Sequence, residues 1–267
     1  MMDMDSGDVT ILSEIFTDLW FDMNPTGDTL VFVKKIGHGT AIYSLPLDSG
    51  AVAIRLSYET DPRNPVFSVD GSLVVYTARD MFGSKNLYTI QPDGSAYKKV
   101  TSFNDPADAV VPVGITTLEP SILYVMPSQT IKNQFEIWSI TLDGSSDQFL
   151  TVCTLEADDR PRISPNGEKV LYQRDHNLWI MNIDGSEQVR LTDLPSGHLA
   201  YHGQYSPSGS HIVYIHRMGN WGAESFIEWV RPNGQDFSRL SERHNIVLSD
   251  NEIQPNNNFR FWPVFQP

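Results

Sequence analysis

Four histidines near residue 200 are the first residues of this sequence whose type and spacing suggest chemistry. His198 and His202 are four positions apart, the spacing of paired metal ligands on a helix, and His211 and His216 follow them. Imidazole is a common ligand of transition metals such as zinc. However, the pair lies in Gly-His-Leu-Ala-Tyr-His, which is typical of a loop entering a strand, and no His-Glu-x-x-His motif accompanies it. We therefore expect no cofactor, with a divalent metal at His198 and His202 as the alternative.

A nucleophile with a supporting base is not recognisable. The chain has no Gly-x-Ser-x-Gly segment, the pattern that marks the nucleophile of α/β-hydrolases. Its single cysteine, Cys153, excludes an internal disulfide and a multi-cysteine zinc site, and its apolar neighbours predict that it packs as a small hydrophobe. Asp158 and Asp159 lie in no dense aspartate loop of the kind that supplies the oxygens calcium needs. We expect no catalytic residue, and the sequence favours a protein that is not an enzyme while leaving an enzyme as the alternative.

The charge balance restricts the classes of partner. The 267 residues include 19 Lys and Arg against 33 Asp and Glu, a formal net charge of -14. This excess of negative charge disfavours nucleic acid and anionic membrane surfaces. No apolar run is long enough to predict membrane insertion, and the first five residues are acidic where a signal peptide would be basic. The sequence slightly favours the cytoplasm and leaves the periplasm open for a chain whose signal was removed.

The elements that must position any site repeat along the chain. A turn element ends in a glycine at Gly27, Gly71, Gly167 and Gly209, and an apolar run rich in Val, Ile and Tyr follows each copy. Such runs, bounded by Pro, Gly and Asn turns, predict buried strands. The gap between the second and third glycines is about two periods, so we expect a degenerate copy between them, near 119–122.

Two further elements complete each period. The second ends in an Asp-Gly, Asn-Gly or Ser-Gly pair, which supplies the positive φ that a tight hairpin requires. The third is a short Leu-Ser, Leu-Thr or Val-Thr segment preceded in most copies by a basic residue. Each period of 40 to 50 residues thus contains four predicted strands, which is typical of one blade of a β-propeller.

The repeats resemble a known family. The segments 163–172 and 177–192 are similar to the WD40-like (PD40) repeat of the TolB family, and the resemblance is strong over 61–105 and 158–241 and poor over 106–135. The same repeat resembles the propellers of TolB, of prolyl-oligopeptidase-type enzymes and of oligogalacturonate lyases, so it implies a fold more than a function. The resemblance implies an all-β propeller of four-stranded blades, six-bladed as in TolB, with a five-bladed ring as the alternative.

A count of strands predicts a single propeller domain over 1–267 with an incomplete sixth blade. We expect five blades at approximately 19–60, 61–105, 106–155, 156–195 and 196–245. The segments 8–14 and 258–267 match an outer and an inner strand of a closing blade. A chain that ends early, a five-bladed ring with extra strands, and an open edge completed by another chain all remain open. The last would give a homo-oligomer through strand addition.

The resemblance also implies where a ligand would bind, because it places the innermost strand of each blade along a central channel. Four positions before each turn, at one mouth of that channel, we expect Trp20, Asn64, Arg160, His202 and Trp262. Beside them we expect Asp61, Arg63, Asp159, Arg162, Tyr201 and Arg260. Arginine offers a planar fork to carboxylates, and tryptophan or tyrosine offers a face for stacking. The set therefore predicts a site for a carboxylate or carbonyl group.

From these observations we expect a non-catalytic recognition scaffold of the TolB-like type, which binds a protein segment or a small molecule at the channel mouth. One alternative is a carbohydrate-active enzyme resembling oligogalacturonate lyase, although the net charge of -14 disfavours a polyanionic substrate. The other alternative is an assembly protein that uses an open blade edge.

Overall fold

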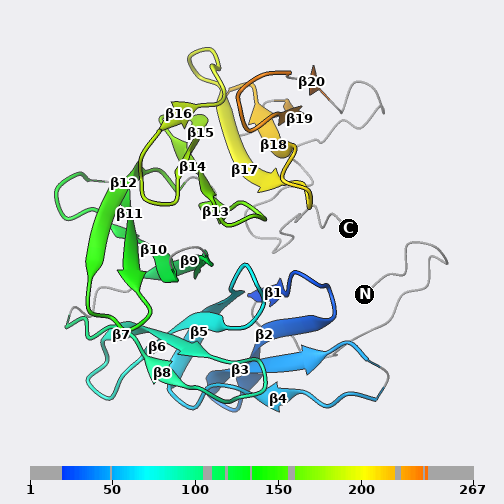
Figure 1. Ribbon diagram of the computed structural model, residues 1–267. Coiled ribbons are helices and arrows are strands. Elements are labelled where there is room, and N and C mark those ends of the chain that lie inside the picture. The colour runs from blue at the N-terminus through cyan, green and yellow to red at the C-terminus, as the bar shows by residue number, and fades with distance from the viewer. Residues whose placement is uncertain are drawn as a thin grey trace.

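The computed structural model describes residues 20–48, 50–104, 110–117, 120–132, 134–155, 160–219, 224–236 and 238–239. Within them the chain forms five four-stranded antiparallel sheets, and strands that follow one another in sequence are neighbours in each sheet. The sheets stand as blades around a common centre, with the first strand of each nearest the centre (Figure 1). Among the described residues no helix is long and apolar enough to span a membrane. The expected all-β propeller of four-stranded blades is confirmed.

The strands of each sheet run outward in chain order. The first sheet consists of β1 (Phe21–Met23), β2 (Thr29–Ile36), β3 (Gly39–Pro46) and β4 (Ile54–Arg55). The second consists of β5 (Thr60–Phe67), β6 (Val74–Arg79), β7 (Lys85–Ile90) and β8 (Lys98–Lys99). The third consists of β9 (Val111–Ile115), β10 (Ser121–Pro127), β11 (Phe135–Thr141) and β12 (Asp147–Cys153). The fourth consists of β13 (Arg162–Ile163), β14 (Lys169–Arg174), β15 (Asn177–Asn182) and β16 (Val189–Arg190), and the fifth of β17 (Leu199–Tyr205), β18 (Ile212–Arg217), β19 (Ser225–Val230) and β20 (Ser238–Arg239).

The turn between the first two strands of each sheet is closed by the side chain of its first residue. In all five sheets an oxygen of this side chain accepts a hydrogen bond from the backbone N–H five residues later, at 2.9–3.2 Å. The residue is Asn24, Ser68, Thr116, Ser164 or Ser206. Thr116, midway between Ser68 and Ser164, does this in the third sheet, whose turn the sequence pattern alone placed a few residues later. The serines of these elements therefore act as turn formers, as expected.

The Ser or Thr of the third repeated element lengthens the outer edge of a sheet. The outermost strand has only two residues in four sheets. In the first, second and fourth sheets, the hydroxyl of the Ser or Thr just beyond that strand accepts a backbone N–H of the third strand. These bonds are Ile42 N to Ser57 Oγ at 2.7 Å, Leu87 N to Thr101 Oγ1 at 2.9 Å and Leu178 N to Thr192 Oγ1 at 3.0 Å. Because a buried N–H without a partner is costly, the hydroxyl is part of the sheet.

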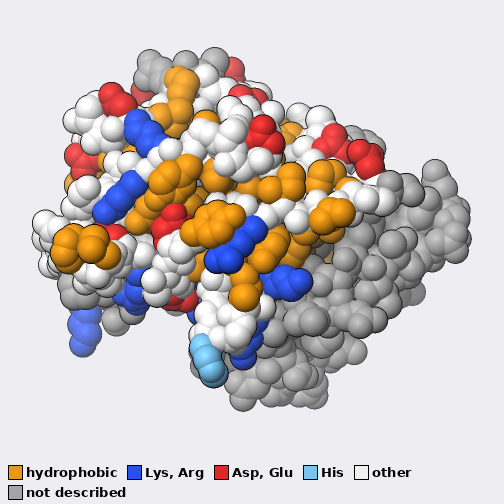
Figure 2. All heavy atoms as spheres, turned by 90° about the horizontal axis from the view of Figure 1, so that it is seen from below, with side chains coloured by type: hydrophobic (Ala, Val, Ile, Leu, Met, Phe, Trp, Pro, Cys, Tyr) orange, Lys and Arg blue, Asp and Glu red, His pale blue; other side chains and the backbone are white. Residues whose placement is uncertain are grey.

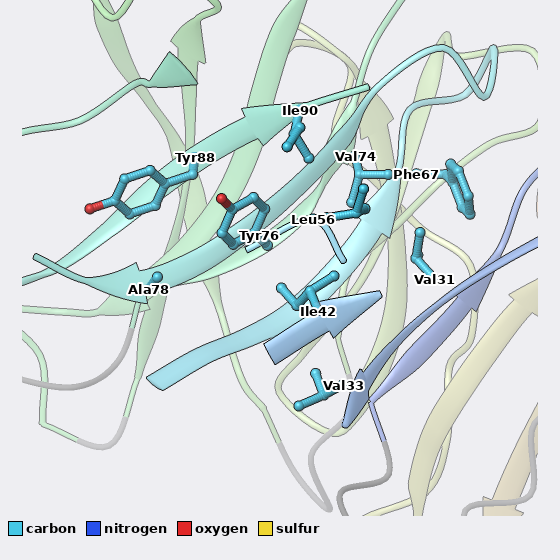
Figure 3. Close-up of a cluster of buried hydrophobic side chains, with 10 residues drawn as sticks. All are labelled: Val31, Val33, Ile42, Leu56, Phe67, Val74, Tyr76, Ala78, Tyr88 and Ile90. Atoms are coloured by element: carbon cyan, nitrogen blue, oxygen red, sulfur yellow. The ribbon is translucent and has the colours of Figure 1, made fainter. Parts of the chain in front are cut away.

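Each hydrophobic core lies between two neighbouring sheets. Between the first and second, Val31, Val33 and Ile42 meet Val74 and Tyr76, as the close-up shows (Figure 3). Clusters of the same kind lie between each following pair of sheets, and Cys153 is buried in the one between the third and fourth. A sheet covered on both faces needs apolar residues at successive positions, which explains the continuous apolar runs in the sequence. Full burial of each such side chain contributes about 1.5–3 kcal/mol.

Neighbouring sheets also touch where their outer hairpins approach. Gly144, in the turn between β11 and β12, has a φ of +77°, and a Cβ at this position would overlap the carbonyl oxygen of Val100 in the second sheet. The glycine therefore meets two requirements at once, a left-handed turn and a close contact with the neighbouring sheet.

Candidate functional site

Three residues expected at the channel mouth come together from three different sheets. The guanidinium carbon of Arg160 lies 3.6 Å from the centroid of the Trp20 ring. Arg160 Nη2 also donates a hydrogen bond of 3.0 Å to Asn64 Oδ1. Trp20 comes just before β1, Asn64 lies in β5, and Arg160 comes shortly before β13. The side chains are far apart in sequence, so only the arrangement of sheets around a centre brings them into contact.

The residues expected around the channel mouth form a ring of positions, one from each blade, and two of these positions, Asn64 and His202, have an unusual backbone. The pairing of β5 with β6 shifts register between Arg63 and Val66, and that of β17 with β18 between Tyr201 and Gln204. Within these bulges Asn64 has a φ of 54° and His202 a φ of 53°. A β-bulge turns a side chain away from its regular direction, and a left-handed residue other than glycine costs about 1 kcal/mol or more. Strain of this kind is found preferentially at functional sites.

Asp22 adds a carboxyl group that the sequence analysis did not select. The backbone N–H of Phe67, in the neighbouring sheet, donates a hydrogen bond of 2.8 Å to Asp22 Oδ2. Burial raises the pKa of Asp22 to about 6, although this hydrogen bond and the positive charge of Arg162 both act to lower it. A signal for this residue was present, because Asp22 is two positions after Trp20 and strand residues two apart share a face.

Arg162 is two positions after Arg160, just as Asp22 is two positions after Trp20. Its Nη1 donates to the carbonyl oxygens of Arg160 at 3.0 Å and of Pro161 at 3.1 Å. These bonds hold the guanidinium against its own strand, from where its charge acts on the carboxyl of Asp22. The centre of the ring therefore contains two arginines, a tryptophan, an amide and a carboxyl group with a raised pKa. Such a set of polar groups with a perturbed pKa is typical of a functional site.

Comparison with solved structures identifies the fold. The putative TolB from Agrobacterium tumefaciens superimposes with a TM-score of 0.60 at 20% identity, over 82% of this chain and 79% of that chain. The fold is that of a TolB-like β-propeller. TolB from Acinetobacter baumannii gives a TM-score of 0.58 at 19% identity over 83% of this chain, which spans 53% of that chain. An oligogalacturonate lyase from Vibrio parahaemolyticus gives 0.60 at 14% identity, over 85% and 64% of the two chains. No family model and no curated protein matches the sequence.

TolB-like propellers of this kind have six blades, and five sheets are seen in the described part of this chain. The segments 8–14 and 258–267, expected in a closing blade, lie outside the described residues. So do three of the residues expected at the channel mouth, Asp159, Arg260 and Trp262. Their place in the propeller therefore stays a prediction.

Arg63 lines a different part of the propeller surface from the contact of Arg160 with Trp20. Its Nε lies 2.9 Å from Asp61 Oδ1, and Arg79 Nε lies 3.8 Å from the other oxygen of that carboxylate. Arg63 and Asp61 line a pocket of about 490 Å³ beside the β2–β3 hairpin of the first blade. The ring of Tyr201 lies 4.9 Å from that of His202, its neighbour in sequence.

Two of the four histidines of the fifth blade form a chain of contacts that leads to a buried carboxylate. His198 Nδ1 lies 2.9 Å from His216 Nε2, and His216 Nδ1 lies 3.0 Å from Glu228 Oε2. Tyr214 Oη and Arg239 Nε also donate to Glu228, each at 3.0 Å, and its side chain has no exposed surface. Burial alone would raise the pKa of Glu228, but these partners together hold it below its usual value.

This network argues against His198 and His202 as a pair of metal ligands. His198 is paired with His216, which in turn is bonded to Glu228. Across the described segments, no three side chains of the His, Cys, Asp or Glu type are grouped so that they could hold a metal ion. The spacing of four that drew attention to His198 and His202 belongs to a helix, whereas in this blade both residues lie at an inner strand.

Proposed function

We propose that this propeller is a non-catalytic recognition scaffold, which binds a protein segment or a small molecule through a carboxylate or carbonyl group at the channel mouth. The contact of Arg160 with both Trp20 and Asn64 carries this proposal. It supports a binding role because the three side chains come from three blades and are held by strands and bulges.

The chemistry of the cluster suits an oxygen-bearing ligand. A guanidinium has five N–H donors in one plane, so it can bind a carboxylate along one edge while another edge bonds to Asn64. The ring of Trp20 lies on one face of this guanidinium and limits its orientation. Because the guanidinium of Arg160 is already held in one orientation before a ligand arrives, less entropy is lost on binding.

The test is binding of short peptides with a free C-terminal carboxylate, each compared with its amidated form by calorimetry. We expect Arg160→Ala to weaken binding of the carboxylate form by roughly 10- to 100-fold, since a hydrogen bond to a charged group contributes about 1.5–3 kcal/mol. Arg190→Ala is the matched control, because Arg190 pairs with Asp193 on the outermost strand of the same blade. Arg160→Lys keeps the positive charge but loses the planar guanidinium, so its affinity for the carboxylate form should lie between those of the wild type and Arg160→Ala.

Equal binding by the Arg160→Ala variant and the wild type would refute the proposal, as would equal binding of the free and amidated peptides. Thermal unfolding of each variant shows whether it is folded, so that a loss of binding is not a loss of structure.

A uronide-cleaving enzyme is the alternative supported by the structural similarity to oligogalacturonate lyases, one of which was solved in complex with manganese. Incubation with oligogalacturonides and manganese distinguishes the scaffold from the enzyme. We expect no cleavage products. Cleavage that is lost in the His202→Ala variant would refute the scaffold and show that the protein is an enzyme. The other alternative is an assembly protein that uses an open blade edge. It predicts that light scattering detects dimers whose fraction increases with protein concentration.

A further inference from the structure

Two adjoining pockets form a groove between the first and second blades, and Thr60 at the start of β5 lines both. One pocket, of about 490 Å³, has Lys35 and His38 of the β2–β3 hairpin in its wall. The other, of about 430 Å³, has Met81 and Phe82 of the β6–β7 hairpin in its wall. Neither pocket is lined by the channel residues Trp20, Asn64 or Arg160, so the groove is separate from the proposed channel site.

The second pocket has an apolar wall that the fold does not need. Met81 is 89% exposed and Phe82 is 84% exposed, side by side at the tip of the hairpin. The turn itself is formed by Asp80 Oδ1, which accepts the N–H of Phe82 at 3.0 Å and of Ser84 at 3.1 Å, and by Gly83 with a φ of +82°. Because the two apolar side chains contribute nothing to this turn, their exposure indicates a contact with another molecule.

The apolar surface continues beyond the pocket. Tyr88, buried in the pocket wall, stacks on Tyr97 with centroids 6.0 Å apart, and Tyr97 is half exposed. Tyr58, 76% exposed, holds the guanidinium of Arg55 at 4.5 Å from its ring centroid. The view from below shows hydrophobic side chains gathered with Lys and Arg side chains among them (Figure 2). Apolar and basic groups are therefore mixed on this side of the molecule.

The charge of the groove differs in sign from that of the whole chain. Four basic side chains line it, Lys35, Arg63, Arg79 and Lys99, against three carboxylates. The chain as a whole has 19 basic residues against 33 acidic ones. Lys35 is exposed and makes no ion pair within the part of the chain that the structure describes. An anionic group in the first pocket would therefore meet a positive charge that no carboxylate of the described residues neutralises.

We propose that this groove binds an extended, acidic and hydrophobic peptide segment of a partner protein. A large apolar side chain of the segment enters the pocket beside Met81 and Phe82, and a nearby Asp or Glu lies next to Lys35 and Arg63. Hydrophobic burial supplies the affinity, and the charge selects acidic segments over basic ones.

The test is selection of a random peptide library, displayed on phage, against the full chain, followed by fluorescence anisotropy with the selected peptides. We expect peptides that combine Asp or Glu with a large apolar residue, and a loss of roughly tenfold or more in affinity for Phe82→Ser. Lys35→Glu should lose the acidic peptides and gain their Lys-substituted versions. Lys132→Glu, a charge reversal at an exposed lysine of the third blade, is the matched control, and Arg160→Ala should bind as the wild type does.

Several outcomes overturn the proposal. They are the absence of any enriched peptide, unchanged affinity in Phe82→Ser and Lys35→Glu, or peptides without acidic residues. Binding of anionic vesicles that is lost in Phe82→Ser would assign the groove to a membrane surface, and dimers that are lost in that variant would assign it to a second copy of the chain. Phe82, Lys35 and Lys132 are exposed, so unchanged thermal unfolding is expected for their variants, and it is measured for every variant alongside.

Discussion

Replacing Asp22 by Asn tests whether the carboxyl group at the centre of the ring is held in an unfavourable environment. Burial raises the pKa of Asp22 to about 6 from its usual 3.8. Between these two values the native carboxyl keeps a proton that the unfolded chain has released, so stability falls as the pH rises through this window. Asparagine stays neutral and retains an oxygen that can accept the N–H of Phe67. The substitution therefore removes the cost of ionisation and keeps the hydrogen bond.

The size of the effect follows from the pKa shift. A rise from 3.8 to about 6 is about two units, and each unit corresponds to about 1.4 kcal/mol, or about 3 kcal/mol in all. Asp22 retains some contact with solvent, which screens its charge, so we expect about 2 kcal/mol. At neutral pH the Asp22→Asn variant should be more stable than the wild type by this amount, with a melting temperature roughly 4–8 °C higher. Near pH 4 the two proteins should be equally stable.

Urea unfolding at a series of pH values from about 4 to about 8 measures the difference directly. Asp48→Asn, at an exposed turn of the first blade, is the matched control and should leave the stability and its pH dependence unchanged. A variant at Asp22 that is less stable than the wild type at neutral pH would refute the reasoning, because it would mean that the ionised carboxylate stabilises the ring. An unchanged slope of stability against pH would refute it as well.

Three further substitutions test the packing and the buried polar groups, each by thermal unfolding. Gly144→Ala places a Cβ against the carbonyl oxygen of Val100 at a positive φ and should cost about 2–4 kcal/mol; a cost below about 1 kcal/mol would contradict that contact. Glu228→Gln leaves the donors of Tyr214, His216 and Arg239 facing a neutral amide in a buried position and should cost about 3 kcal/mol. Because the pKa of Glu228 is lowered, its stabilising effect is present above its usual 4.5 and is lost as the pH falls, so the variant and the wild type should converge in acid. Thr192→Val removes the hydroxyl that accepts a backbone N–H of β15 and should cost about 1–3 kcal/mol, whereas Ser208→Ala, in an exposed turn, should be neutral.

The repeated elements could be recognised from sequence because their determinants are local. Ser164 bonds to a backbone N–H five residues away, and an Asp-Gly pair selects its turn without help from the rest of the chain. Apolar runs such as 30–33 are continuous because both faces of each blade are covered, and this too is visible in the sequence. Thr116 was missed as the turn residue of the third blade because threonine replaces serine and the Pro and Gly that normally follow are missing.

The candidate site was partly predictable. The repeat placed Trp20, Asn64 and Arg160 at equivalent positions, and the structure brings these three into contact. The same reasoning did not select Asp22, although its place two residues after Trp20 was visible, because the burial that raises its pKa exists only in the folded ring. It also paired His198 with His202, whereas the hairpin of β17 and β18 pairs His198 with His216.

The sequence by itself therefore determined the architecture of this protein, which is built from repeated four-stranded units whose turns are closed by side chains within a few residues of one another. Only the tertiary structure decided which side chains meet between units, such as Arg160 with Trp20, and where Met81 and Phe82 border an open groove. The physical reason is the range of the interactions. Turns and strand periodicity are set by neighbours in the chain, whereas the contacts, burial and electric field of a site depend on residues that the ring brings together from different blades.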